Sequence, residues 1–177
     1  MEYVDDTRYD AGEVEDNEPR YDTDAVKYRL IEYRENERDI ENQLERLDRL
    51  ELKLRSIGSP VFSDMPKSPS PSQDRMADMI ARKVDLENEI RDAVAEQKKE
   101  REAIESILKK LRHSDERAVI RMRYFDGVSW YAVSDMLFGG KDDFLDKEDT
   151  YLRRSHKIHG SALLNMAIII EGEKKNG

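Results

Sequence analysis

The fold is decided by one uninterrupted stretch, residues 23–57, which reads TDAVKYRLIEYRENERDIENQLERLDRLELKLRSI. Its apolar residues recur in alternating steps of four and three, and Glu37 and Glu51 occupy two positions of the same stripe. The apolar members of the stripe are Val26, Leu30, Tyr33, Ile40, Leu44, Leu47 and Leu54. A heptad period of this kind turns one narrow face of a helix toward another helix. Because neither Pro nor Gly interrupts the stretch, it predicts one long helix.

A second stretch with the same spacing, residues 73–112, predicts a partner of nearly equal length. Its stripe consists of Met76, Ile80, Ile90, Val94, Ile104, Leu108 and Leu111. Four prolines lie between the two stretches, within residues 58–72, and prevent a continuous helix there. We therefore expect a linker over 58–72 and an antiparallel helical hairpin. Since polar residues interrupt both stripes, we also expect the long helices to pair with a second copy of the chain, as a dimer.

The composition excludes several classes of protein. Charged residues make up 40% of the 177 residues, against about 25% in an ordinary domain. The absence of Cys excludes disulfide scaffolds, thiol catalysis and Cys-ligated metal sites. No apolar run approaches the roughly 20 residues that span a bilayer, and the first residues do not resemble a signal peptide. We expect a cytoplasmic protein with no membrane partner.

The net charge of −9 is concentrated at one end of the chain. Residues 1–24 hold ten acids and two bases, whereas the rest of the chain is close to neutral. Residues 1–22 show no apolar period, so we expect an acidic, disordered tail. Such a tail either improves solubility or competes with nucleic acid for a basic surface.

Residues 113–170 change to three shorter helical units. Asp126-Gly127 ends the first unit and Phe138-Gly139-Gly140 ends the second. The third is expected over 149–170, followed by a tail at 171–177. Its inward face is predicted to consist of Leu152, Ser155, Ile158, Ala162 and Met166. Three short helices in this order predict a helix-turn-helix domain after the hairpin, so the whole chain is expected to be all-α.

The opposite face of the third unit is basic. Its candidate DNA-binding residues are Thr150, Arg153, Arg154, His156, Lys157 and Ser161. Arginine can bind a guanine edge with two hydrogen bonds, and lysine and serine can bind phosphates. The alternative is that these residues form an ordinary solvated surface.

Other candidate sites are weaker. Trp130 lies at an apolar position of the second unit, so it is expected in the core rather than on a base. His156 and His159 lack the further ligands that a metal ion requires. We find no nucleophile–base pair and no cofactor motif, and therefore expect neither a cofactor nor an enzyme.

Two segments of this region resemble known regulators. Residues 119–134, VIRMRYFDGVSWYAVS, resemble sigma-70 region 4, in which an acidic–Gly turn separates a Leu-Arg-Tyr-type helix from a Ser-aromatic helix. Residues 157–163, KIHGSAL, are similar to the final helix of small phage regulators of the ArpU/RinA type. The resemblance covers about residues 111–166. It implies a transcriptional activator of phage genes that contacts the host RNA polymerase.

One segment departs from this pattern. Residues 139–148 make a longer and more acidic turn than the three or four residues of an ordinary helix-turn-helix. Two hypotheses follow from the sequence. The first is a regulator that binds double-stranded DNA, working in the cytoplasm of a bacterial host. The second is a coiled-coil assembly factor or a small terminase-like packaging protein.

Overall fold

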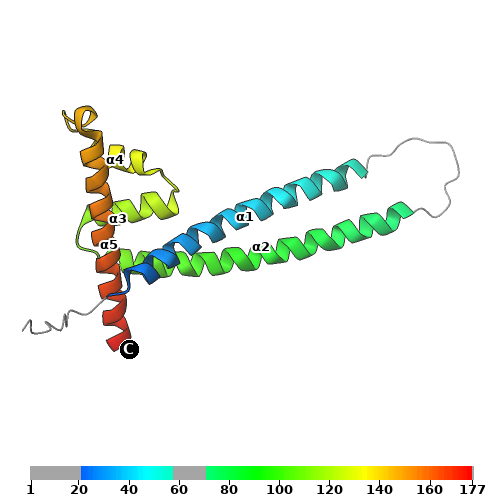
Figure 1. Cartoon of the computed structure of the whole chain (residues 1–177). Helices are drawn as coiled ribbons and strands as arrows, with labels where there is room; N and C mark the ends of the chain where they lie inside the picture. The colour runs from blue at the N-terminus through cyan, green and yellow to red at the C-terminus, as the bar shows by residue number, and fades with distance from the viewer. Residues whose placement is uncertain (1–20, 58–70, 177) are drawn as a thin grey trace, which may run out of the picture.

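The computed structural model describes residues 21–57 and 71–176. In these residues every regular element is helical, so the predicted all-α class is confirmed. The elements are two long helices, two short ones and a long final helix. Figure 1 shows a hairpin of two long helices whose end meets the C-terminal helices. The expected tail at residues 1–20 and the linker residues 58–70 lie outside the described residues.

The hairpin is formed by α1, Thr23–Ile57, and α2, Pro71–Lys110. The bounds of α1 agree with the sequence prediction, and the Asp22 side chain accepts a hydrogen bond of 2.8 Å from the Ala25 amide at its start. Helix α2 begins and ends two residues earlier than predicted. Pro71, which we assigned to the linker, instead lies at the first helical position, where a missing N–H has no cost.

The contact between α1 and α2 is richest in buried apolar residues at one end. Near the C-terminal helices it buries Val26, Leu30 and Tyr33 against residues of α2 that include Ile104 and Leu108. Ion pairs also join the helices: Arg29 binds Glu100 within this apolar end, and Lys83 binds Glu51 farther along, where Leu86 and Ile90 are buried as well. The hairpin is therefore anchored most firmly at its base, and its far half combines a few buried apolar residues with weak, solvated ion pairs.

Most residues of the two predicted stripes are buried or half-buried, as predicted, and four of them are exposed. Leu44, Ile80 and Val94 are each close to one-half exposed, and Met76 is 36% exposed. Leu44, Ile80 and Val94 lie one residue beyond positions on the contact face, such as Gln43, Met79 and Ala93, which are half-buried. Because a shift of one residue rotates a side chain by about 100°, these three point away from the partner helix.

Two short helices follow the hairpin. Helix α3, Ser114–Ile120, continues into a π-helical turn at Arg121–Phe125. Gly127 then adopts φ +65°, a left-handed conformation that glycine tolerates best. Helix α4, Trp130–Phe138, begins where the Ser129 side chain accepts a hydrogen bond from the Ala132 amide. The C-terminal ends of the first two predicted units therefore agree with the structure.

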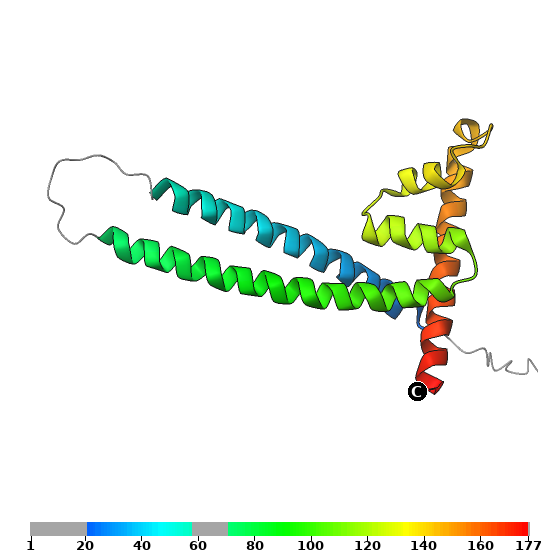
Figure 2. The same cartoon turned by 180° about the vertical axis from the view of Figure 1, so that it is seen from behind.

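The third unit is longer than predicted. Helix α5 spans Glu148–Asn176, 29 residues or about 44 Å, and includes most of the segment 171–177 that we expected to be a tail. Figures 1 and 2 show α5 lying across the end of the hairpin, with α3 and α4 beside one half of it. The additional turns do not form an isolated extension, because Glu173 forms an ion pair with Lys110 at the end of α2.

One hydrophobic core joins the hairpin to the C-terminal helices. Its buried residues come from α1, α2, α3 with the π-helical turn, and α5. The α5 contribution is Ala162, Leu163, Met166 and Ala167. The helix-turn-helix segment is therefore not a separate unit on a flexible arm, and α5 is fixed in orientation relative to the hairpin.

Candidate nucleic-acid interface

One face of α5 carries the six candidate residues, and all six are exposed. Thr150, Arg153, Arg154 and Lys157 follow one another at helical spacing on the first three turns of α5. No ion pair joins Arg153, Arg154 or Lys157 to any residue that the structure describes. These cations are free to bind an external anion.

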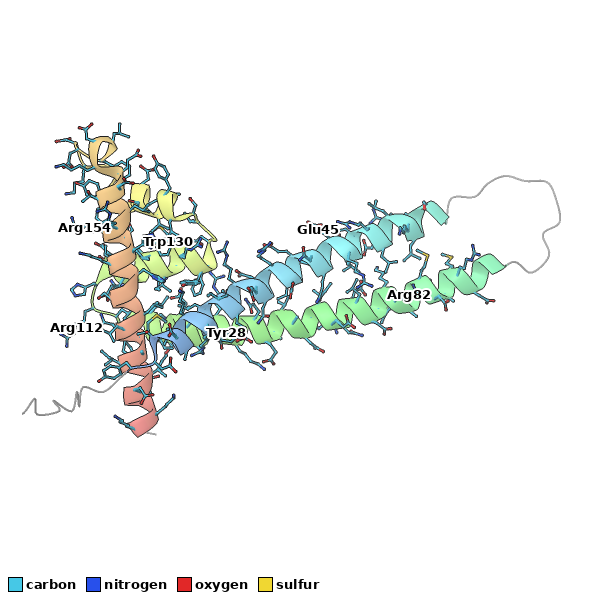
Figure 3. The ribbon with its side chains drawn as sticks, in the orientation of Figure 1. Tyr28, Glu45, Arg82, Arg112, Trp130 and Arg154 are labelled. Atoms are coloured by element: carbon cyan, nitrogen blue, oxygen red, sulfur yellow. The ribbon has the colours of Figure 1, made fainter. Side chains whose placement is uncertain are left out.

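Arg154 is positioned by an aromatic ring. Its guanidinium lies 5.0 Å from the centre of the Phe138 ring, at the end of α4. A guanidinium over an aromatic ring is attracted by the negative electrostatic potential of the ring face. Figure 3 labels Arg154 on α5 and Trp130 on the side of the C-terminal helices that faces the hairpin.

The opposite face of α5 is packed as the sequence predicts. Ser155, Ala162 and Met166 are buried, and Leu152 and Ile158 are half-buried. Ser134 of α4 is also buried, and its small side chain permits close packing where α4 meets α5. The cationic face of α5 is therefore held by helices that pack against its other side.

Ser161 has a different environment from the other candidates. Its hydroxyl donates a hydrogen bond of 2.6 Å to Glu116 Oε1, and Asn165 Nδ2 donates to the same oxygen at 2.9 Å. Glu116 is 3% exposed, so its carboxylate is a buried link between α3 and α5. Because this bond uses its only hydroxyl proton, Ser161 serves to position α5.

His156 also has an internal partner. Its ring lies 4.2 Å from the Trp130 ring, centre to centre, and His159 meets the same indole edge-on at 5.0 Å. Trp130 is half-buried rather than fully in the core, and the Arg123 guanidinium lies 5.3 Å from its ring centre. His156 therefore lies at the edge of the cationic face, on the flank that faces α4.

His159 is buried. Its Nε2 lies 3.0 Å from the Tyr124 hydroxyl. Burial, and then the positive charges of Lys27, His156 and Arg123, lower the pKa of His159 to about 4. The imidazole is therefore neutral near pH 7, and Nε2 can accept the Tyr124 proton.

The long turn before α5 is ordered by aromatic packing. Phe144 is buried and lies 5.6 Å from the Tyr151 ring, which in turn lies 5.1 Å from Phe138. Asp143 accepts hydrogen bonds from Lys147 and Tyr151, and these bonds lower its pKa to about 2. A short 3-10 turn at Leu145–Lys147 then leads into α5.

This turn decides where the candidate recognition helix begins. Helix α5 starts at Glu148, so the turn before it is an elaborated loop and Thr150 lies in the first helical turn. Glu148 and Asp149 precede Thr150, and the helix dipole stabilises acidic side chains in a first turn. The cations of the face begin only at Arg153.

Sequence reasoning missed a second basic surface. Lys27, Arg34 and Arg38 of α1 line a cleft together with Arg123 and His156 of the C-terminal helices. The α1 residues lie about a hundred positions before Arg123 and His156 in the sequence, and no local pattern connects the two groups. Only the packing of α1 against α5 and the π-helical turn brings them together.

The described residues offer little support for other kinds of site. Among them, no group of three His, Asp or Glu side chains gathers in a way that could hold a metal ion. The part of the chain that the structure describes also contains no helix with the length and apolarity needed to cross a membrane.

Comparison with protein-family models, with curated proteins and with solved structures gave no match. The resemblance to sigma-70 region 4 and to phage activators therefore stays a prediction.

Proposed function

We propose that this protein is a sequence-specific transcriptional regulator that binds double-stranded DNA through α5. The observation that carries the proposal is the row of Arg153, Arg154 and Lys157 on the free face of a helix whose other face is packed. All three cations are exposed, and none makes an ion pair with a described residue, so their charges are available to phosphates.

The chemistry of this face suits a major groove. Arg153 and Lys157 are four residues apart, about 6 Å along the axis, so they lie one above the other on the helix. An arginine there can donate two hydrogen bonds to a guanine, while Lys157 neutralises a phosphate. The helices α3 and α4 pack behind α5, as the supporting helices of a helix-turn-helix do.

The acidic loop limits how the protein can approach DNA. The loop and the first turn of α5 carry acids at 142, 143, 146, 148 and 149. Since phosphates repel these carboxylates, the duplex should lie toward the C-terminal side of Thr150, nearest Arg153, Arg154 and Lys157.

Self-association is the second part of the proposal. Leu52, Ile80, Val84 and Val94 are exposed apolar side chains of the hairpin. Covering them against a second hairpin would remove apolar surface from water and place two copies of α5 in one particle. A dimer would then bind two half-sites separated by whole helical turns of DNA, about 34–36 Å each.

The resemblance to sigma-70 region 4 adds a partner and a setting. A phage regulator of this kind would work in the cytoplasm of the bacterial host. It would contact the host RNA polymerase while α5 holds the promoter DNA.

A second candidate function is a coiled-coil assembly protein or a small terminase-like packaging protein. The same exposed apolar residues of the hairpin favour it, because they suit a larger oligomer as well as a dimer. In this case the basic face of α5 would bind DNA without sequence preference, or bind only protein.

The test is selection of bound sequences from a random duplex pool with the full chain. The regulator should enrich one sequence, and Arg153→Ala with Lys157→Ala should abolish the enrichment. The matched control, Arg75→Ala with Lys98→Ala, removes two exposed cations of α2 and should leave it unchanged. Absence of an enriched sequence, together with a ring-sized particle in light scattering, would instead support the packaging protein.

A further inference from the structure

A cleft of about 490 Å3 lies between α1 and the C-terminal helices. One wall is α1, through Lys27, Ile31 and Arg34 and the following turn. The other wall comes from the π-helical turn, the start of α4, and α5. Its volume falls in the range of about 300–1,000 Å3 that ligand pockets occupy.

The charges that line this cleft are almost all positive. They are Lys27, Arg34, Arg38 and Arg123, with the His156 imidazole beside them, against the single carboxylate of Glu35. None of the Lys and Arg side chains forms an ion pair with a described residue. Elsewhere on α1 and the π-helical turn, Arg29 and Arg121 each bind a carboxylate. The cleft therefore concentrates unneutralised charge in a chain that has acids in excess.

The cleft is partly organised before any ligand binds. Arg123 donates a hydrogen bond of 3.0 Å to the Val128 carbonyl and lies over the Trp130 ring. Arg34 reaches across from α1, so that its Nη2 would lie 3.7 Å from a Cβ placed on Gly127. Guanidinium groups held in this way lose less conformational entropy when they bind an anion.

The positive potential of the cleft is felt by a neighbouring group. The charges of Lys27, His156 and Arg123 help to lower the pKa of His159, after the larger effect of its burial. Because both walls of the cleft contribute, their cations act on the same volume.

The length of the cationic row indicates the kind of anion. Lys27 and Arg38 are eleven residues apart on α1, a distance of about 16 Å along the helix axis. One phosphate cannot reach both ends, whereas a chain of phosphates can. The Trp130 ring already has the Arg123 guanidinium and the His156 and His159 imidazoles close to it, so contact through phosphates is favoured over base stacking.

We infer that this cleft binds the sugar–phosphate backbone of a single nucleic-acid strand, through Lys27, Arg34, Arg38 and Arg123. The site lies on another flank of α5 from Arg154 and Lys157, so the inference goes beyond the proposed function and does not depend on it. A strand held here would run along α1 from Lys27 toward Arg38, because the cations of α1 form the longer wall.

Trp130 makes the test direct. It is the one tryptophan of the chain and lines the cleft, so its fluorescence reports on binding there. The full-length protein is titrated with an oligothymidylate of about 12 nucleotides, within the range that single-strand sites cover. We expect saturable quenching whose affinity falls steeply with salt.

The variant that tests the site is Arg34→Gln with Arg38→Gln, which should weaken binding by about tenfold or more. Arg75→Gln with Lys98→Gln removes the same charge from exposed positions of α2 and should stay within about twofold of wild type. Arg38→Gln alone alters only an exposed residue, so its weaker binding cannot reflect misfolding. Arg153→Ala with Lys157→Ala should leave the quenching intact, which separates this site from the duplex face.

Three results would overturn the inference. The first is unchanged affinity in the Arg34→Gln, Arg38→Gln variant. The second is complete displacement of the oligonucleotide by inorganic pyrophosphate at equal phosphate concentration, which would indicate a site for free polyphosphates. The third is equal quenching by poly-glutamate, which would indicate an acidic peptide as the ligand.

Discussion

Acidification should destabilise this protein through His159. The unfolded chain takes up the proton with a pKa near 6.5, whereas burial and neighbouring cations lower the pKa in the folded protein to about 4. The unfolded state therefore binds more protons in this interval. The stabilising contribution is fully present above pH 6.5 and is lost as the pH falls toward 4.

The size of the effect follows from the two pKa values. Their difference corresponds to about 3 kcal/mol at the limit, and access of solvent from the cleft reduces this to about 2 kcal/mol. Protonation also removes the acceptor that Nε2 offers to the Tyr124 hydroxyl, 3.0 Å away. The groups that face His159 from α1 and α5 include Lys27 and His156, which oppose a further positive charge.

The assay is urea denaturation from about pH 7.5 to pH 4.5, with wild type, His159→Gln and His113→Gln in parallel. Carboxylates titrate in all three proteins, so only the difference between them is informative. As the pH falls across this range, the difference in the free energy of unfolding between wild type and His159→Gln should shrink by about 2 kcal/mol. Because His113 is exposed, the His113→Gln variant should show the same pH dependence of stability as wild type. An NMR titration that gives His159 a pKa near 6.5 would refute the reasoning. So would free energies of unfolding that change with pH in parallel for all three proteins.

Three further outcomes follow from the fold and the interface. Leu108→Ala, in the core that α2 shares with α5, should cost about 2–5 kcal/mol and lower one common melting transition; separate melting of the C-terminal helices at an unchanged temperature would contradict the shared core. Gly127→Ala should cost about 1–2 kcal/mol in urea denaturation because of φ +65°, while Gly140→Ala, with open space around it, should be close to neutral. The salt dependence of duplex binding should have a log–log slope of up to about −2.7 per chain from the three cations of α5, and Lys157→Ala should reduce its magnitude by about 0.9; an unchanged slope would exclude Lys157 from phosphate contact.

Much of the secondary structure could be predicted because it depends on local signals. The heptad spacing from Val26 to Leu54 and the absence of Pro and Gly define α1 without reference to other elements. Gly127 follows the end of the π-helical turn, and Gly139 follows the end of α4, so both ends have a local signal in the sequence. The end of α5 was predicted too early; in its last turns Glu173 forms an ion pair with Lys110 of α2, a contact between distant residues that no local pattern reports.

The candidate interface was predictable in part for the same reason. Arg153, Arg154 and Lys157 share a face through helix periodicity alone, and the structure leaves that face exposed. The hydrogen bond that binds Ser161 to the buried Glu116 joins residues 45 positions apart, so the sequence could not assign Ser161 an internal role. Likewise, the contact of His156 with Trp130 depends on how α4 packs against α5.

The sequence by itself determined the all-helical class, the hairpin and the basic face of α5, because helix periodicity and chain-breaking residues act within a few positions. The tertiary structure alone decided which stripe residues, such as Leu44 and Val94, are exposed, how far α5 extends, and that Lys27, Arg34 and Arg38 meet Arg123 across one cleft. These features arise from contacts between distant segments. A one-residue difference in register, such as that between Gln43 and Leu44, rotates a side chain from the contact to solvent.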